Sequence, residues 1–83
     1  MKIDSRLKVI QVSCYSGYKA SERPINFTFR GQKLLVEEIL DRWYGVNHSY
    51  FKILANDQRV YIISYDEDED LWTLEKILGL KIG

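Results

Sequence analysis

The chain has 83 residues, of which 46% are hydrophobic and 13% aromatic, and its 12 basic residues balance its 12 acidic ones. This length and composition predict one globular domain over residues 1–83 and exclude a disordered chain. The single cysteine excludes an internal disulfide and no apolar run approaches the roughly 18 residues of a membrane span, so we expect a cytoplasmic protein that does not enter a membrane.

The first predicted element is a strand over residues 7–14, where apolar and polar side chains alternate. Its more apolar face carries Ile10, Val12 and Cys14. Cys14 is therefore expected to be a small buried side chain. A nucleophilic role needs a base nearby, and the chain offers one histidine.

A predicted loop over residues 15–24 contains the first candidate binding residues, Tyr15, Tyr18, Lys19 and Arg23. Aromatic and basic side chains together can stack on bases and pair with phosphates. The two tyrosines would equally suit a lid over one end of the core, with their hydroxyl groups in water. Loops on rigid scaffolds often carry function, so this loop is the first candidate surface.

Residues 25–30 show the clearest alternation, with Ile25, Phe27 and Phe29 on one face. Gly31 and Gln32 follow, and a glycine at the first central position suits a two-residue turn of type II′. The basic residues lie mainly before residue 34 and the acidic ones after it, so a fold that separates the two parts would be strongly dipolar.

Residues 33–44 fit two structures. In a helix Leu35, Ile39 and Trp43 share one face, and Gly45 would follow the helix end. A strand with a bulge at Glu37 and Glu38 instead gathers one set of side chains on one face: Leu34, Val36, Ile39, Asp41 and Trp43. Periodicity slightly favours the helix, whereas the preceding tight turn and strand favour a long, bent strand; Trp43 and Tyr44 are expected in the core and at its rim.

The centre of the chain predicts a β-hairpin from residues 50–54 and 60–65, which are rich in aromatic and β-branched side chains. The turn over residues 55–59 would place Gln58 in the left-handed conformation and pair Phe51 with Ile63. One face then forms the core: Phe51, Ile53, Tyr61, Ile63 and Tyr65. The other face is also mostly apolar and should be partly covered, which indicates a curled sheet or a small barrel.

The remaining segments carry no clear chemistry. His48 lies in a predicted loop over residues 46–49 and has no evident catalytic or metal-binding partner. The acidic run 66–70 lacks the glycine and spacing of a calcium loop and is expected to be a solvated turn. A short strand over 71–75 should close the domain, with 76–83 as a loosely ordered tail, although a helical turn over this region also fits.

Two blocks of sequence, CYSGYKASERP and EEILDRWYG, together with HSYFKI and VYIISYDEDED, resemble a family of small uncharacterised bacterial domains. Related domains are similar to C-terminal domains of proteins that resemble translesion DNA polymerases. The resemblance implies a strand over the second block and a context of DNA repair. It implies no activity and no catalytic residue, and the position of Gln58 is more often glycine in similar chains.

Together these observations predict a mostly β fold, with five or six antiparallel strands in a curled sheet or SH3-like small barrel; the alternative is α+β with residues 33–44 helical. We expect a non-catalytic binding or adaptor module without cofactor or metal, whose partner is a nucleic acid or a protein. The alternative is a module for protein–protein contact or self-association through an exposed sheet edge, as a monomer or weak homodimer. A small enzyme using His48 and Cys14 is the least favoured interpretation.

Overall fold

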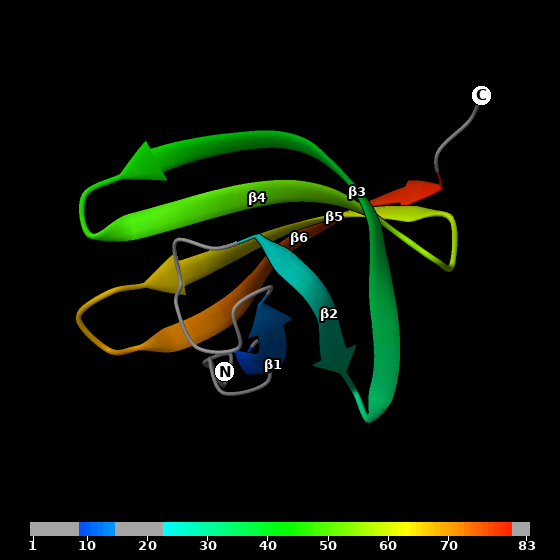
Figure 1. Cartoon of the computed structure of the whole chain (residues 1–83), viewed down its shortest axis with the longest axis horizontal. Helices are drawn as coiled ribbons and strands as arrows, with labels where there is room; N and C mark the ends of the chain where they lie inside the picture. The colour runs from blue at the N-terminus through cyan, green and yellow to red at the C-terminus, as the bar shows by residue number, and fades with distance from the viewer. Residues whose placement is uncertain (1–8, 15–22, 81–83) are drawn as a thin grey trace, which may run out of the picture.

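The computed structural model describes residues 9–14 and 23–80, apart from the side chain of Leu80, and every regular element within them is a β-strand. In chain order the strands are β1 (Val9–Cys14), β2 (Pro24–Phe29), β3 (Gln32–Gly45), β4 (His48–Ala55), β5 (Arg59–Asp66) and β6 (Leu71–Leu80). Each pairs antiparallel with the next, and β6 pairs with β1, so the sheet closes into a barrel (Figure 1). The predicted mostly β small barrel is confirmed, and the helical alternative for residues 33–44 is wrong.

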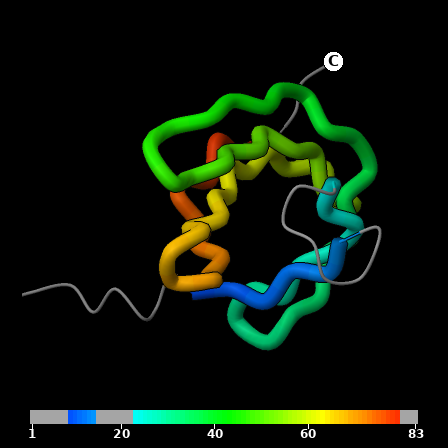
Figure 2. Tube along the Cα trace, turned by 60° about the vertical axis from the view of Figure 1, so that its left-hand side comes forward, coloured from blue at the N-terminus to red at the C-terminus, as the bar shows by residue number. Residues whose placement is uncertain are grey.

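The core fills the inside of this barrel, around which the backbone forms a ring (Figure 2). Phe27, Phe51, Ile53 and Ile63 are completely buried there. The predicted apolar face of β1 is confirmed, because Ile10 and Cys14 are also buried. Between β1 and β6 the described residues form two pairs, Val9 with Thr73 and Ile10 with Trp72.

The β4–β5 hairpin has the predicted register. Phe51 pairs with Ile63, and Leu54 pairs with Val60. Gln58 has a φ of 69°, the left-handed conformation expected for it, and its backbone N–H donates to the carbonyl oxygen of Ala55 at 3.0 Å. The alternating apolar residues and the turn chemistry therefore specify this hairpin correctly.

The outer face of the same hairpin is partly covered, as its apolar composition predicts. Leu54 and Val60 are each 8% exposed, and Ser64 is 2% exposed. The Ser64 hydroxyl donates to Oε2 of Glu75 at 2.6 Å. Glu75 lies at an irregularity in the β5–β6 pairing, which brings its carboxylate onto Ser64 and satisfies this buried hydroxyl.

Strand β3 is long and bent and forms part of the barrel wall (Figure 1). Its first residues pair with β2, and the rest of it pairs with β4. The predicted bulge at Glu37 is confirmed, because Val36 and Glu38 oppose the consecutive residues Ala55 and Leu54. A second irregularity, at Leu40, changes which residues face inward.

Beyond Leu40 the predicted inner face of β3 is wrong. Arg42 pairs with the core residue Phe51, whereas Asp41 and Trp43 pair with outward-facing residues of β4. Trp43 is 37% exposed and Tyr44 is 66% exposed. Neither ring belongs to the core, so the prediction that Trp43 is a core residue is wrong.

The turn between β2 and β3 also differs from its prediction. Phe29 pairs with Gln32, so the two central residues are Arg30 and Gly31 rather than Gly31 and Gln32. Their φ angles are 54° and 78°, and two positive values define type I′ rather than type II′. Type I′ matches the twist of the two strands, which offsets the strain of a left-handed arginine.

Two element boundaries need correction. Strand β6 continues to Leu80, which pairs with Arg59, so the predicted end at residue 75 is too early and residues 76–80 are not a loose tail. His48 lies in β4 rather than in a loop, because it pairs with Gly45 on one side and Asp66 on the other. The β5–β6 turn is solvent-exposed from Glu67 to Asp70, as expected.

Candidate functional site

The structure places one of the four predicted binding residues. Arg23 is exposed and lies directly before Pro24, the first residue of β2. It lines a hollow of about 480 Å³ together with Glu37 and Glu38, whose carboxylates make this hollow unsuitable for phosphate. Tyr15, Tyr18 and Lys19 lie outside the described residues.

A second hollow, of about 400 Å³, lies between the β2–β3 turn and the β4–β5 turn. Its lining combines two arginines with apolar side chains and a few polar groups: Phe29, Arg30, Gln32, Leu34, Asp57, Arg59, Tyr61 and Ile77. We call this region the arginine end of the barrel. Its volume falls in the range of pockets that hold small ligands or single groups of larger ones.

Asp57 provides the only carboxylate among the lining residues of the arginine end, and both of its oxygens accept a hydrogen bond. The hydroxyl of Tyr61 donates to Oδ2 of Asp57 at 2.5 Å, and the backbone N–H of Arg59 donates to Oδ1 at 3.0 Å. Burial, and then the bond to Asp57, raise the pKa of Tyr61 to about 12, while the nearby Arg59 guanidinium acts in the opposite direction. Tyr61 therefore stays neutral and fixes Asp57 in place.

The two guanidinium groups of the arginine end are exposed, and that of Arg59 also interacts with the hydroxyl group of Tyr61. Within residues 9–14 and 23–80, neither Arg30 nor Arg59 has an ion-pair partner, and both are exposed. The guanidinium carbon of Arg30 lies 5.1 Å from the ring centre of Phe29, a cation–π contact that restricts its side chain. Guanidinium groups bind phosphate or carboxylate oxygens through paired hydrogen bonds, so this end suits an anion.

Charge is separated along the barrel. The arginine end lies where β4 ends and β5 begins, whereas the acidic run 66–70 follows the opposite end of β5, roughly 20 Å away at the usual rise per strand residue. Figure 1 shows the β4–β5 turn and the β5–β6 turn on opposite sides of the molecule. An anionic partner is thus attracted to one end and repelled from the other.

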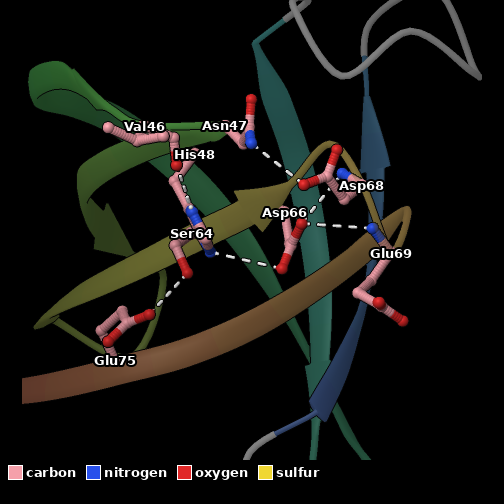
Figure 3. Close-up of polar contacts among 8 residues, drawn as sticks. All are labelled: Val46, Asn47, His48, Ser64, Asp66, Asp68, Glu69 and Glu75. Carbon is pink, nitrogen blue, oxygen red and sulfur yellow. Dashed lines mark hydrogen bonds and ion pairs between the residues drawn. The ribbon is translucent and has the colours of Figure 1, made fainter.

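Contacts at the acidic end join the β3–β4 turn to the β5–β6 turn (Figure 3). The backbone N–H of Glu67 donates to the carbonyl oxygen of Asn47 at 2.9 Å, and Nδ2 of Asn47 donates to Oδ2 of Asp68 at 3.0 Å. Asp66 accepts from the backbone N–H groups of Asp68 and Glu69 through Oδ1. These bonds fix the two turns against each other, and we call the joined pair the hairpin tip.

His48 completes these contacts. Its Nδ1 lies 2.9 Å from the carbonyl oxygen of Val46, and its Nε2 lies 3.4 Å from Oδ2 of Asp66 (Figure 3). Both neighbouring oxygens are acceptors, so only the doubly protonated ring donates to both of them. The geometry gives His48 a structural role at the tip.

Residues 9–14 and 23–80 include one cysteine, Cys14, and one histidine, His48. They contain no group of three or more His, Cys, Asp or Glu side chains arranged to hold a metal ion. No helix in this part of the chain is long and apolar enough to cross a membrane. Cys14 is buried at the end of β1, while His48 is engaged with Val46 and Asp66.

Comparison with known proteins finds no matching family model, no matching curated protein and no matching solved structure. The site must therefore be judged from its own residues. Sequence reasoning missed the arginine end because Arg30 and Arg59 come from different turns. The signal that was available is a basic residue beside each turn, at Arg30–Gly31 and at Gln58–Arg59.

Proposed function

We propose that the protein is a non-catalytic binding module that takes up single-stranded nucleic acid at the arginine end of the barrel. The observation that carries this proposal is the pair of guanidinium groups, Arg30 and Arg59, at a hollow with a mixed polar and apolar lining whose carboxylate, Asp57, already accepts two hydrogen bonds. A role close to DNA metabolism, as the sequence resemblance implies, belongs to the same proposal.

The shape of the arginine end favours a single strand over a duplex. Proteins that bind single strands combine basic groups for the backbone with apolar or aromatic surfaces for the bases. Here the guanidinium groups would contact phosphates, while Phe29 and Ile77 offer apolar surface to one unstacked base. A duplex keeps its bases stacked, so it would gain the phosphate contacts alone.

The proposal is tested by fluorescence anisotropy with labelled oligothymidine of roughly 12 nucleotides, a length within the usual site sizes. We expect binding at low salt that weakens as salt is added. In an Arg30→Gln/Arg59→Gln double variant, affinity should fall at least tenfold at low salt. The slope of log affinity against log salt should become shallower by about 1.4, because two phosphate contacts are lost.

Lys76→Gln controls for the loss of a basic charge outside the arginine end, because Lys76 is an exposed cation on β6 that does not line the hollow. It should retain nearly the full affinity. A Tyr18→Ala variant tests the predicted loop separately. Absence of binding at the lowest salt, or equal loss in the Lys76→Gln and arginine variants, would contradict the proposal.

The second candidate function is self-association through a sheet edge. Among the described strands, β3 pairs with β4 alone between Val36 and Gly45, and self-association would use the other side of β3 outside Arg42, whose backbone N–H donates to Oδ1 of Asp41. Light scattering over a concentration series separates the two functions, because a strict monomer that binds oligothymidine rules out self-pairing as the main role.

We also propose that the protein works in the reducing cytoplasm, because its single cysteine cannot form an internal disulfide.

A further inference from the structure

The two ends of the barrel expose groups of opposite charge. The arginine end carries the guanidinium groups of Arg30 and Arg59 at a hollow of about 400 Å³. The turn between β5 and β6 is exposed throughout and consists of four consecutive acidic residues, Glu67–Asp70, which we call the acidic turn. Guanidinium groups pair with carboxylates as well as with phosphates, so the acidic turn carries groups that the arginine end can bind.

Two carboxylates of the acidic turn are free for such a contact. In the part of the chain that the structure describes, the side chains of Glu67 and Glu69 have no hydrogen-bond or ion-pair partner. The carboxylates of Asp68 and Asp70 each accept a hydrogen bond from another side chain. Figure 3 shows the carboxylate of Glu69 directed away from the other residues drawn. Glu67 and Glu69 are therefore the groups that a cationic surface would meet.

The hairpin tip holds the acidic turn in one shape. The backbone N–H of Glu67 donates to the carbonyl oxygen of Asn47 at 2.9 Å. The backbone N–H of Glu69 donates to Oδ1 of Asp66 at 3.2 Å. Because both residues use backbone groups in these bonds, their carboxylates stay exposed while the turn is fixed. A turn fixed in this way loses little conformational entropy when it binds.

One molecule cannot place its acidic turn in its own arginine end. The two lie at opposite ends of β5, roughly 20 Å apart at the usual rise per strand residue, and on opposite sides of the molecule (Figure 1). A second copy of the chain can bring them together. The contact would join two different surfaces, so each molecule in a pair keeps one unused arginine end or acidic turn, and further copies can add.

From these observations we propose that the arginine end takes up the acidic turn of a second copy of this chain, so that the molecules associate head to tail. Glu67 and Glu69 of one copy contact Arg30 and Arg59 of the next. The acidic turn then occupies the groups that would hold phosphates, so association and nucleic-acid binding exclude each other. The association stands on the charges of the two ends alone, whereas this competition rests on the function proposed above.

The nature of the contact sets the conditions under which it forms. Exposed ion pairs contribute little free energy each and are screened by salt. Association should therefore need high protein concentration and low salt. A nucleic acid presents phosphates in series and releases counterions when it binds, so it should displace the acidic turn from the arginine end.

The experiment measures the weight-average mass of the full chain by sedimentation equilibrium, in a concentration series that extends to about 1 mM, since the contact is weak. At low salt the mass should rise with concentration and pass the mass of a dimer. Added salt should return it to the mass of the monomer. An excess of oligothymidine should likewise leave single chains bound to the strand.

Two double variants each remove one partner of the contact. Arg30→Gln/Arg59→Gln keeps an intact acidic turn, and Glu67→Gln/Glu69→Gln keeps an intact arginine end. Each variant alone should stay monomeric over the whole series. An equal mixture of the two should form a dimer and nothing larger, because it contains one intact surface of each kind per pair. This dimer would also show that both variants are folded.

Single substitutions outside the two ends control for the loss of charge. Asp41→Asn removes an exposed carboxylate and Lys76→Gln an exposed cation, and both should associate as the native chain does. A native chain that stays monomeric at low salt, association that persists in either double variant, or a mixture without dimers would overturn the proposal. Persistent association would indicate pairing through a sheet edge. A monomer that binds oligothymidine would refute the association while leaving the proposed function intact.

Discussion

Replacement of Tyr61 by phenylalanine tests the network that organises the arginine end. Tyr61 is 2% exposed, and its hydroxyl donates to Asp57 at 2.5 Å. A hydrogen bond to a charged acceptor contributes about 1.5–3 kcal/mol, and Asp57 keeps its bond from the Arg59 N–H in the variant. We therefore expect Tyr61→Phe to lower the free energy of unfolding at neutral pH by about 1–2 kcal/mol.

The same network predicts how stability depends on pH. The pKa of Tyr61 rises from 10.0 in an unperturbed tyrosine to about 12 in the folded protein, mainly through burial. The unfolded chain therefore loses this proton first as the pH increases. The contribution is complete below pH 10.0 and is lost towards about pH 12, and a shift of this size corresponds to roughly 3 kcal/mol.

The assay is urea unfolding of the native chain and of Tyr61→Phe over a series of pH values. Between pH 10.0 and about 12 the stability advantage of the native chain over Tyr61→Phe should shrink and pass through zero. Tyr44→Phe is the control, because it removes an exposed hydroxyl and should leave the slope unchanged. A difference that stays constant over this range would refute the role given to Tyr61.

Two other substitutions test local features of the fold. Gly45→Ala should displace the ring of Tyr50, because the new Cβ would lie 3.1 Å from its Cε1 atom. The aromatic NMR signals of Trp43 and Tyr50, whose rings stack, should therefore shift. Unchanged signals would contradict the stacked arrangement. Gln58→Gly should stabilise the protein by up to about 1 kcal/mol in thermal or urea unfolding, because φ at Gln58 is 69° and glycine adopts this conformation without strain; a loss of stability would contradict the turn.

The β4–β5 hairpin could be predicted from sequence down to its register, because two independent signals agree there. Alternating apolar residues define the faces, and Asn56 and Asp57 define the turn. The bulge at Glu37 was also predictable, since an unbroken alternation would have buried acidic side chains.

The second irregularity in β3, at Leu40, was not predictable in the same way. Asp41 and Arg42 are both polar, so the pattern does not indicate which of them faces the core, and Trp43 was assigned to the wrong face as a result. In the structure Arg42 lies on the face of Phe51 but stays exposed, with its guanidinium carbon 5.0 Å from the ring centre of Phe51. A cation–π contact of this kind leaves no mark in hydrophobic periodicity.

The end of β6 and the candidate sites depend on contacts between distant parts of the chain. Gly79 lies within β6 and has a φ of 96°. In the sequence, a glycine at this position suggests that the strand has already ended. Arg30 and Arg59 are brought together only when the barrel closes. The sequence predicted a dipolar molecule only for a fold that separates its basic first part from its acidic remainder, and the position of each charge required the register of the strands.

The central claim is that the arginine end binds nucleic acid, and chemical-shift mapping tests it most directly. In ¹H–¹⁵N spectra of the full chain titrated with oligothymidine at low salt, we expect the largest shifts at Arg30, Gln32, Asp57 and Arg59, with the signals of Trp43 and His48 unchanged. Shifts centred on the hairpin tip, or no shifts at any position, would contradict the account.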